Sequence, residues 1–187
     1  YGCLGGQAGA GALVEVLTGA QNPCGKLAET WARSYADTSA KEHFGGDGPT
    51  VEYREGLYVG YRYYDTAGVP TAFPFGYGLS YTTFTQTLNS VTEADGTITV
   101  DVTVTNTGSA SGKEVVEVYY NPPYTNGGIE KSSANLLDFA KTGELAPGES
   151  ETIDFTIPVE DLASYDYQNN GCYVLEAGDN VICANDD

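Results

Sequence analysis

Residues 70–84 read PTAFPFGYGLSYTTF, and this segment separates two unlike halves of the chain. Pro70 and Pro74 fix φ near about −65° and lack a backbone N–H donor, so the segment is neither a helix interior nor a central strand. Gly76 and Gly78 permit backbone conformations that a side chain would forbid. Large apolar residues fill most of the other positions, whereas a flexible linker is rich in Gly and Ser. We therefore expect a buried connector of fixed geometry.

The sequence after the connector has the period-2 pattern of β-strands. Residues 97–105 read TITVDVTVT and place Ile98, Val100, Val102 and Val104 on one face. Further strands are expected at residues 83–92, 114–120, 135–141 and 151–157, and a final hairpin pairs 173–176 with 180–183 across Gly178-Asp179. Roughly seven short strands separated by turns predict a β-sandwich of the immunoglobulin or fibronectin type III kind.

The sequence before the connector has one helix and long extended arms. A helix is expected at residues 8–18, an extended segment at 26–31, a polar loop at 34–49 and an extended aromatic segment at 51–65. Such a segment cannot form a core alone, so it is expected to be the last part of a larger α/β unit. The predicted fold class is mainly β with a small α/β part. The predicted division is 1–69 for the α/β part, 70–95 for the connector and first strand, and 96–187 for the β-sandwich.

Composition excludes several classes of partner. The chain has 187 residues with 26 acids against 8 Lys and Arg, a formal charge of −18, so we expect no nucleic-acid partner and no anionic membrane surface. No apolar run approaches the roughly 18 residues of a membrane span. Neutral substrates such as sugars stay compatible with this charge. Because the sequence has no Met, not even at position 1, we expect an internal or processed piece of a longer protein. The compartment stays open, with an inclination towards a secreted or periplasmic protein.

The cysteines and the single histidine do not form a metal-binding pattern. Cys3, Cys24, Cys172 and Cys183 include no C-x-x-C pair, and His43 lies in a polar loop, so no zinc site and no cofactor are expected. Cys172 and Cys183 flank the expected final hairpin and either form a disulfide or remain thiols. Residues 166–171, DYQNNG, begin like a calcium-binding loop but lack its acids at positions 3 and 12, which favours a polar loop.

The aromatic segment contains the candidate ligand contacts. Glu55 lies between Arg54 and Gly56, where it either approaches a ligand or forms a structural ion pair. Tyr58 and Tyr61 can stack on sugar rings or pack between layers. With 26 carboxylates in the chain, spacing alone does not identify an acid/base pair, since a retaining glycosidase needs two carboxyl groups about 5–5.5 Å apart in space.

Three blocks together resemble glycoside hydrolase family 3. LGGQAGAGALVEVLTGAQNPCGKLAETW at residues 4–31 looks like the late helix-and-turn segment of that family's second domain. YREGLYVGYRYYD at 53–65 and FPFGYGLSYTTF at 73–84 follow in the family's order and spacing. The remainder is similar to the fibronectin type III-like domain of its β-glucosidases. Cys24 departs from the family, which commonly has Ser at this place in the turn.

The resemblance implies a retaining β-glucosidase that acts on β-linked glucosides and cello-oligosaccharides. It also implies that the Asp nucleophile lies in a separate (β/α)8 barrel and the Glu acid/base upstream in the α/β sandwich domain, so no catalytic residue is expected here. Expected partners are that barrel and the rest of the sandwich domain, with Glu55, Tyr58 and Tyr61 near the substrate. The tail resembles members with permuted domains. The alternative is a stand-alone carbohydrate-binding or cell-surface adhesion module.

Overall fold

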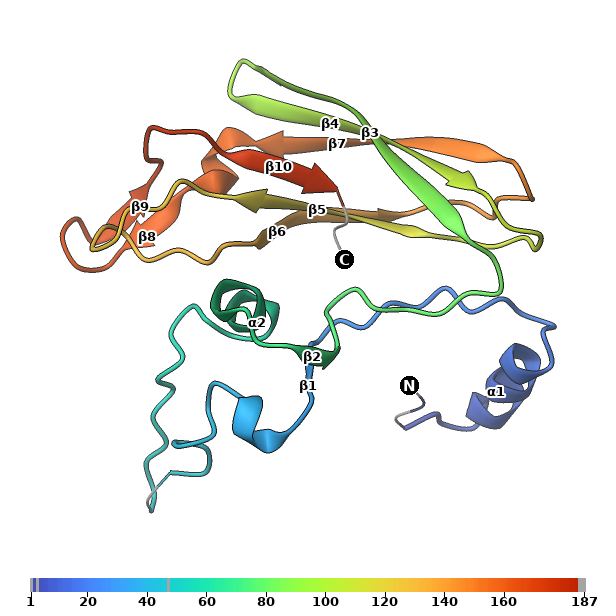
Figure 1. The fold of residues 1–187 in the computed structure, drawn as a ribbon, viewed down its shortest axis with the longest axis horizontal. Helices are drawn as coiled ribbons and strands as arrows, with labels where there is room; N and C mark the ends of the chain where they lie inside the picture. Colours follow the sequence, from blue (N-terminus) through green and yellow to red (C-terminus); the bar gives the residue numbers. More distant parts are fainter. Residues whose placement is uncertain (1, 3, 47, 185–187) are drawn as a thin grey trace.

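Two antiparallel sheets face each other in the part of the chain that follows the connector (Figure 1). The computed structural model describes residues 2, 4–46 and 48–184; Tyr1, Cys3 and the last residues of the tail lie outside this range. One sheet has the order β3-β4-β7, formed by β3 (Phe84–Ala94), β4 (Thr97–Asn106) and β7 (Ser150–Pro158). The other has the order β10-β5-β6, formed by β10 (Val181–Ala184), β5 (Val115–Asn121) and β6 (Asn135–Lys141). The β-sandwich is confirmed.

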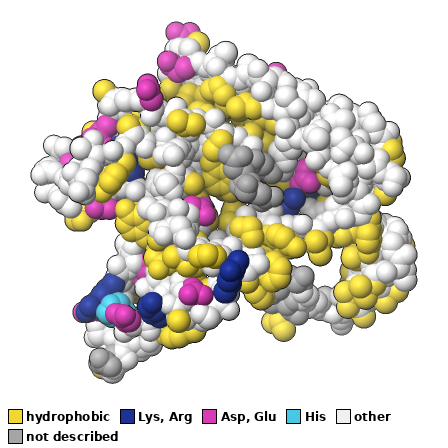
Figure 2. Space-filling view, viewed as in Figure 1, with side chains coloured by type: hydrophobic (Ala, Val, Ile, Leu, Met, Phe, Trp, Pro, Cys, Tyr) yellow, Lys and Arg dark blue, Asp and Glu magenta, His cyan; other side chains and the backbone are white. Residues whose placement is uncertain are grey.

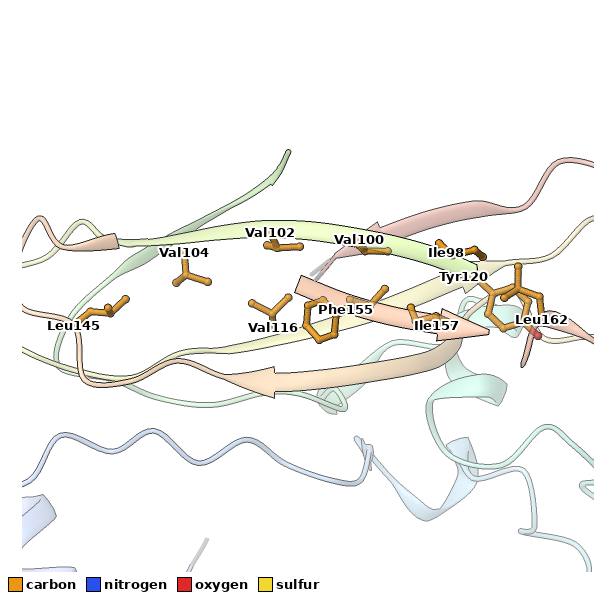
Figure 3. Close-up of a cluster of buried hydrophobic side chains, with 11 residues drawn as sticks. Ile98, Val100, Val102, Val104, Val116, Tyr120, Leu145, Phe155, Ile157 and Leu162 are labelled. Carbon is orange, nitrogen blue, oxygen red and sulfur yellow. The ribbon is translucent and has the colours of Figure 1, made fainter. Parts of the chain in front are cut away.

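The core lies between these two sheets and follows the predicted alternation. Val100, Val102 and Val104 on β4 have no exposed surface, and Ile98 is 6% exposed. Figure 3 shows these side chains pointing into the space between the sheets, where Val116 and other apolar side chains lie. The predicted inward face of residues 97–105 is therefore confirmed. Its burial is the main apolar stabilisation of the sandwich.

Strand β5 is buried on both faces, which distinguishes it from β4. Val116 and Val118 point into the core, while Val115 and Glu117, at 7% and 9% exposure, lie on the opposite face. A strand covered on both sides lacks the in–out alternation of a half-exposed strand. The segments before β3 provide the second cover, because they run beneath the β10-β5-β6 sheet in Figure 1.

The N-terminal half contains short elements that leave most of its residues exposed. They are α1 (Gly9–Leu17), β1 (Trp31–Ala32), the 3₁₀ turn η1 (Tyr35–Asp37), α2 (Tyr61–Ala67) and β2 (Thr71–Phe73). The helix predicted at 8–18 is confirmed, and Gly19 follows it at φ 77°. β1 and β2 pair as a small antiparallel sheet. Among the described residues, no helix has the length and apolar character to cross a membrane.

The extended segment predicted at 51–65 was wrong beyond its first residues, because residues 54–57 form a turn and a helix follows. Residues from Tyr61 form α2, which Gly60 precedes at φ 59° and Gly68 ends in the left-handed conformation. Tyr61 and Tyr64 lie three residues apart and so share one helix face. Tyr64 is 7% exposed, and this burial explains why an aromatic run that looks β-like becomes a helix.

The predicted final hairpin was also wrong. β9 (Cys172–Val174) pairs with β8 (Ser164–Asp166), which follows the 3₁₀ turn η2 (Val159–Leu162), while β10 pairs with β5. Asp166 closes the β8–β9 turn: its carboxylate accepts the backbone N–H groups of Gln168, Asn169 and Asn170 at 3.0–3.2 Å. This turn directs the chain into a separate hairpin before it rejoins the sandwich.

Candidate functional site

Two glycines allow the connector to approach the N-terminal half and strand β5 closely. Gly76 donates its N–H to the Leu27 carbonyl at 2.8 Å and has φ 78°. A Cβ at Gly76 would lie 2.5 Å from Glu117 Oε2, and one at Gly78 would lie 2.7 Å from the Gly25 carbonyl oxygen. The predicted conformational need for glycine is confirmed at Gly76. Gly78 does not have a positive φ, and glycine is needed there only because of the close contact.

Aromatic rings form the apolar part of this interface. Tyr61 on α2 packs against Phe75 of the connector at 5.1 Å between centroids and against Tyr119 of β5 at 5.8 Å. Tyr119 donates its hydroxyl to Glu117 Oε2 at 2.6 Å. Burial, with this hydrogen bond and the Glu117 charge, raises the pKa of Tyr119 far above its usual value. The hydroxyl therefore stays protonated and keeps the Glu117 carboxylate bonded.

The connector is less buried than the sequence predicts. Leu79 is 69% exposed and Tyr81 51% exposed, although the Tyr81 hydroxyl donates to the Val16 carbonyl at 2.7 Å. Phe75 packs against Tyr61, whose ring also contacts Tyr119 of β5, whereas the Tyr81 hydroxyl reaches α1. The covered part of the connector is therefore the part that contacts β5.

Polar contacts fix the Asn22-to-Lys26 turn to the sandwich. Asn22 donates its amide to the Ser111 carbonyl at 2.8 Å, and Lys26 Nζ lies 2.7 Å from Glu114 Oε1. Lys141 donates to the Cys24 carbonyl at 2.8 Å and lies 3.6 Å from the Cys24 sulfur. The turn accommodates Cys24 in place of Ser because the shorter contact from Lys141 is to the backbone carbonyl of this residue and not to its side chain.

Tyr58 and Tyr61 both direct their hydroxyls towards the sandwich. Tyr58 donates to Glu130 Oε2 at 2.7 Å, and the backbone N–H of Leu136 donates to the Tyr61 hydroxyl at 2.9 Å. The hydrogen bond to Glu130 is the main reason that the pKa of Tyr58 is raised to about 12, and burial and the Glu130 charge add to it. Both tyrosines therefore contact the β-sandwich through their hydroxyls.

Glu55 has a different environment from its two neighbours. Its carboxylate makes no hydrogen bond or ion pair with any residue that the structure describes, although it is partly buried. Arg54 pairs with Glu52 instead, with Nε 2.6 Å from Glu52 Oε2. Of the two alternatives for Glu55, the structural ion pair is therefore not formed among the described residues. The Glu55 carboxylate is available for other contacts.

The loop before this segment surrounds an open pocket of about 270 Å³. It is lined by Glu42, His43, Phe44, Gly46, Thr50, Glu52 and Arg54. Figure 2 shows the histidine among basic and acidic side chains at this end of the molecule. Within the described ranges, no group of three His, Cys, Asp or Glu side chains is arranged to hold a metal ion.

The two remaining candidates from the sequence are the cysteine pair and the Asp166 loop. Cys172 is an exposed free thiol on β9, and Cys183 lies on β10 in another sheet, so the Cys172–Cys183 disulfide is not formed. Their separation follows from the β8–β9 pairing. The Asp166 carboxylate accepts backbone N–H groups of its own loop: burial raises the pKa of Asp166, but the N–H groups of residues 168–170 outweigh this and hold it below its usual value.

The interface also contains residues that sequence reasoning did not identify, namely Glu114, Glu117, Glu130, Lys131 and Asn106. Glu117 could have been identified from the sequence, because a single acid on the outward face of an otherwise apolar strand indicates that this second face is also covered. Glu130 and Lys131 could not have been identified in this way, because they lie in a polar loop where charged residues are ordinary.

The fold and interface define the class of this chain: a β-sandwich is fixed to a smaller half that contains helices. Residues 1–81 match the glycosyl hydrolase family 3 C-terminal domain, and residues 114–186 match the fibronectin type III-like domain. The chain belongs to glycoside hydrolase family 3. The predicted fold class and family are thereby confirmed.

Relatives of known name and structure agree with this assignment. Thermostable beta-glucosidase B of Acetivibrio thermocellus is 42% identical over 183 residues, which cover 96% of this chain and 24% of that protein. The solved structure of beta-glucosidase 3B from Thermotoga neapolitana in complex with alpha-D-glucose matches with a TM-score of 0.87 and 44% identity, over 95% of this chain and 25% of that one. Beta-glucosidase from Kluyveromyces marxianus in complex with glucose matches with a TM-score of 0.88 and 34% identity, over 94% and 21%. The chain spans about a quarter of the length of these relatives.

Proposed function

We propose that this chain is the non-catalytic, bracing part of a retaining β-glucosidase that removes terminal β-linked glucose from glucosides and cello-oligosaccharides. The chain matches relatives named as β-glucosidases over nearly its whole length. The nucleophile and the acid/base are proposed to lie in the rest of the protein, and the chain alone is proposed to be inactive.

The observation that carries the proposal is the lack of a core in the N-terminal half. Among the described residues up to position 81, only Tyr64 is buried. Large apolar side chains stay exposed, with Phe44 at 79% and Leu17 at 71%. Figure 2 shows hydrophobic side chains on the open surface of this half. Such surfaces mark contact sites, and the proposed partners are the remainder of the α/β sandwich domain and the (β/α)8 barrel.

The same observation disfavours a stand-alone binding module. That alternative requires an N-terminal half with its own core, which the described residues do not form. The division at residues 1–69, 70–95 and 96–187, and a permuted domain order, remain proposals. β3 falls within the 70–95 segment but pairs with β4 and is therefore part of the sandwich, so the pairing favours a sandwich that begins at Phe84.

We further propose that the segment with Glu55, Tyr58 and Tyr61 approaches the substrate in the whole enzyme. Glu55 is the residue with a free carboxylate, and Tyr58 and Tyr61 fix its surroundings. A full-length protein with Glu55→Gln should hydrolyse an aryl β-glucoside with a reduced kcat/KM, while Glu160→Gln, at an exposed position, serves as the matched control. Equal kinetics for both variants would remove Glu55 from the site.

A further inference from the structure

The loop between β5 and β6 contains a buried ion pair, although its sequence is polar. The Lys131 side chain is only 4% exposed; its Nζ lies 2.5 Å from Glu176 Oε2 and donates to the Pro123 carbonyl at 2.8 Å. A buried ammonium is unfavourable unless it is paired and hydrogen-bonded. A Cβ on Gly178 would lie 2.9 Å from Pro123 Cβ, so the β9–β10 loop closes tightly against the same residues. The buried ion pair therefore joins these two loops.

The residue next to this buried pair contacts the aromatic segment. Glu130 accepts the Tyr58 hydroxyl at 2.7 Å, and the Lys131 carbonyl lies 3.3 Å from the same hydroxyl. Hydrogen bonds to a charged acceptor are roughly twice as strong as those between neutral groups. Because Lys131 holds the loop in place, Glu130 is presented to Tyr58 from a rigid support.

Two further contacts join the same two segments. Leu136 donates its N–H to the Tyr61 hydroxyl, and Ser133 donates its N–H to Thr66 Oγ1 at 2.9 Å. Residues 58–66 are thus attached to residues 130–136 at three separate points. Glu55 lies three positions before the first point, and the Tyr58 N–H donates to the Glu55 carbonyl at 3.0 Å. A displacement of Tyr58 would therefore move Glu55.

We propose that Glu130 is a positioning residue for glycoside hydrolysis: supported by the Lys131–Glu176 pair, it holds Tyr58 and thereby places Glu55 at the mouth of the active site. This inference rests on the proposed function of the segment. It assigns the β-sandwich a part in catalysis beyond general support, because one of its loops sets the position of a segment that belongs to the α/β unit.

The kinetic test uses the full-length protein with Glu130→Gln, Tyr58→Phe and the double variant. Each single change should lower kcat/KM for an aryl β-glucoside by about tenfold or more, as expected for loss of a hydrogen bond to a charged group. The double variant should be no slower than the slower single variant, since both changes remove one interaction. Glu160→Gln and Tyr173→Phe, which change the same chemical groups at exposed positions, should keep wild-type kinetics.

A second readout separates this inference from the proposed function. Hydrogen exchange of the backbone amides of residues 52–60 should become about tenfold faster in Glu130→Gln and stay unchanged in Glu160→Gln. If the wild-type protein hydrolyses no β-glucoside, the proposed function fails. Unchanged hydrogen exchange of residues 52–60 in Glu130→Gln would overturn the positioning contact independently of that result. Faster exchange with unchanged kcat/KM, or additive effects in the double variant, would also overturn the role of Glu130. Tyr58→Phe removes a single oxygen atom and supplies the same test if Glu130→Gln does not fold.

Discussion

Replacing Gly76 with Ala tests how closely the connector is fitted to the β-sandwich. The residue has φ 78°, where an L-residue loses roughly 1–2 kcal/mol relative to glycine. The added Cβ would also lie 2.5 Å from Glu117 Oε2. The carboxylate is the end of a flexible side chain, but it is only 9% exposed and bonded to the Tyr119 hydroxyl at 2.6 Å. Moving it weakens a hydrogen bond to a charged group, which contributes about 1.5–3 kcal/mol.

Together these effects predict that Gly76→Ala lowers the free energy of unfolding by about 3–4 kcal/mol. Gly68→Ala is the matched control, because Gly68 has φ 63° and open space around its Cβ position. Gly68→Ala should therefore lower the free energy of unfolding only through the cost of a positive φ, which is about 1 kcal/mol. In a Glu117→Ala background the obstacle is gone, so Gly76→Ala should also cost about 1 kcal/mol there.

Urea unfolding of the 187-residue chain measures these differences through its single tryptophan. Trp31 pairs with Phe73 of the connector at 6.1 Å between ring centroids, so its fluorescence reports on this region. Equal destabilisation by Gly76→Ala and Gly68→Ala would refute the close approach of Gly76 to Glu117. An unchanged effect of Gly76→Ala in the Glu117→Ala background would refute it independently.

Two further predictions concern stability. Asn106 is fully buried, and its side chain makes four hydrogen bonds, to Thr82, Gly108, Ala110 and Leu145. Asn106→Ala should therefore lower the free energy of unfolding by about 3 kcal/mol, whereas Asn89→Ala at an exposed position should stay below about 1 kcal/mol in the same urea titration. Tyr58 has its pKa raised to about 12, so its neutral hydroxyl stabilises the fold below about pH 10 and this contribution is lost as the pH rises towards 12. The difference in unfolding free energy between wild type and Tyr58→Phe should therefore shrink over that window, and a constant difference would contradict the bond to Glu130.

The β-sandwich was predictable because its strands carry local signals. The alternating valines of β4 indicate the inward face without knowledge of the partner sheet, and the polar turns separate the strands. The two errors occurred where distant contacts decide the structure. α2 forms because Tyr64 is buried and glycines bound the helix, and β10 joins β5 because Asp166 closes a turn upstream.

The interface was less predictable than the fold. Gly76 and Gly78 could be identified from the sequence, because glycine between aromatic residues indicates a position where a side chain would not fit. The Tyr58–Glu130 bond joins residues 72 positions apart, and neither residue has a local pattern that points to the other. Glu55 was selected for its place among aromatic residues, and its role in substrate binding remains a proposal.

The most direct test of the central claim is a comparison of turnover by two purified proteins. The 187-residue chain and the full-length protein that contains it are each assayed with an aryl β-glucoside at equal molar concentration. We predict release of the aryl group by the full-length protein and none by the 187-residue chain. Turnover by the short chain, abolished by substitution of one of its own carboxylates, would contradict its assignment as the non-catalytic part of a β-glucosidase.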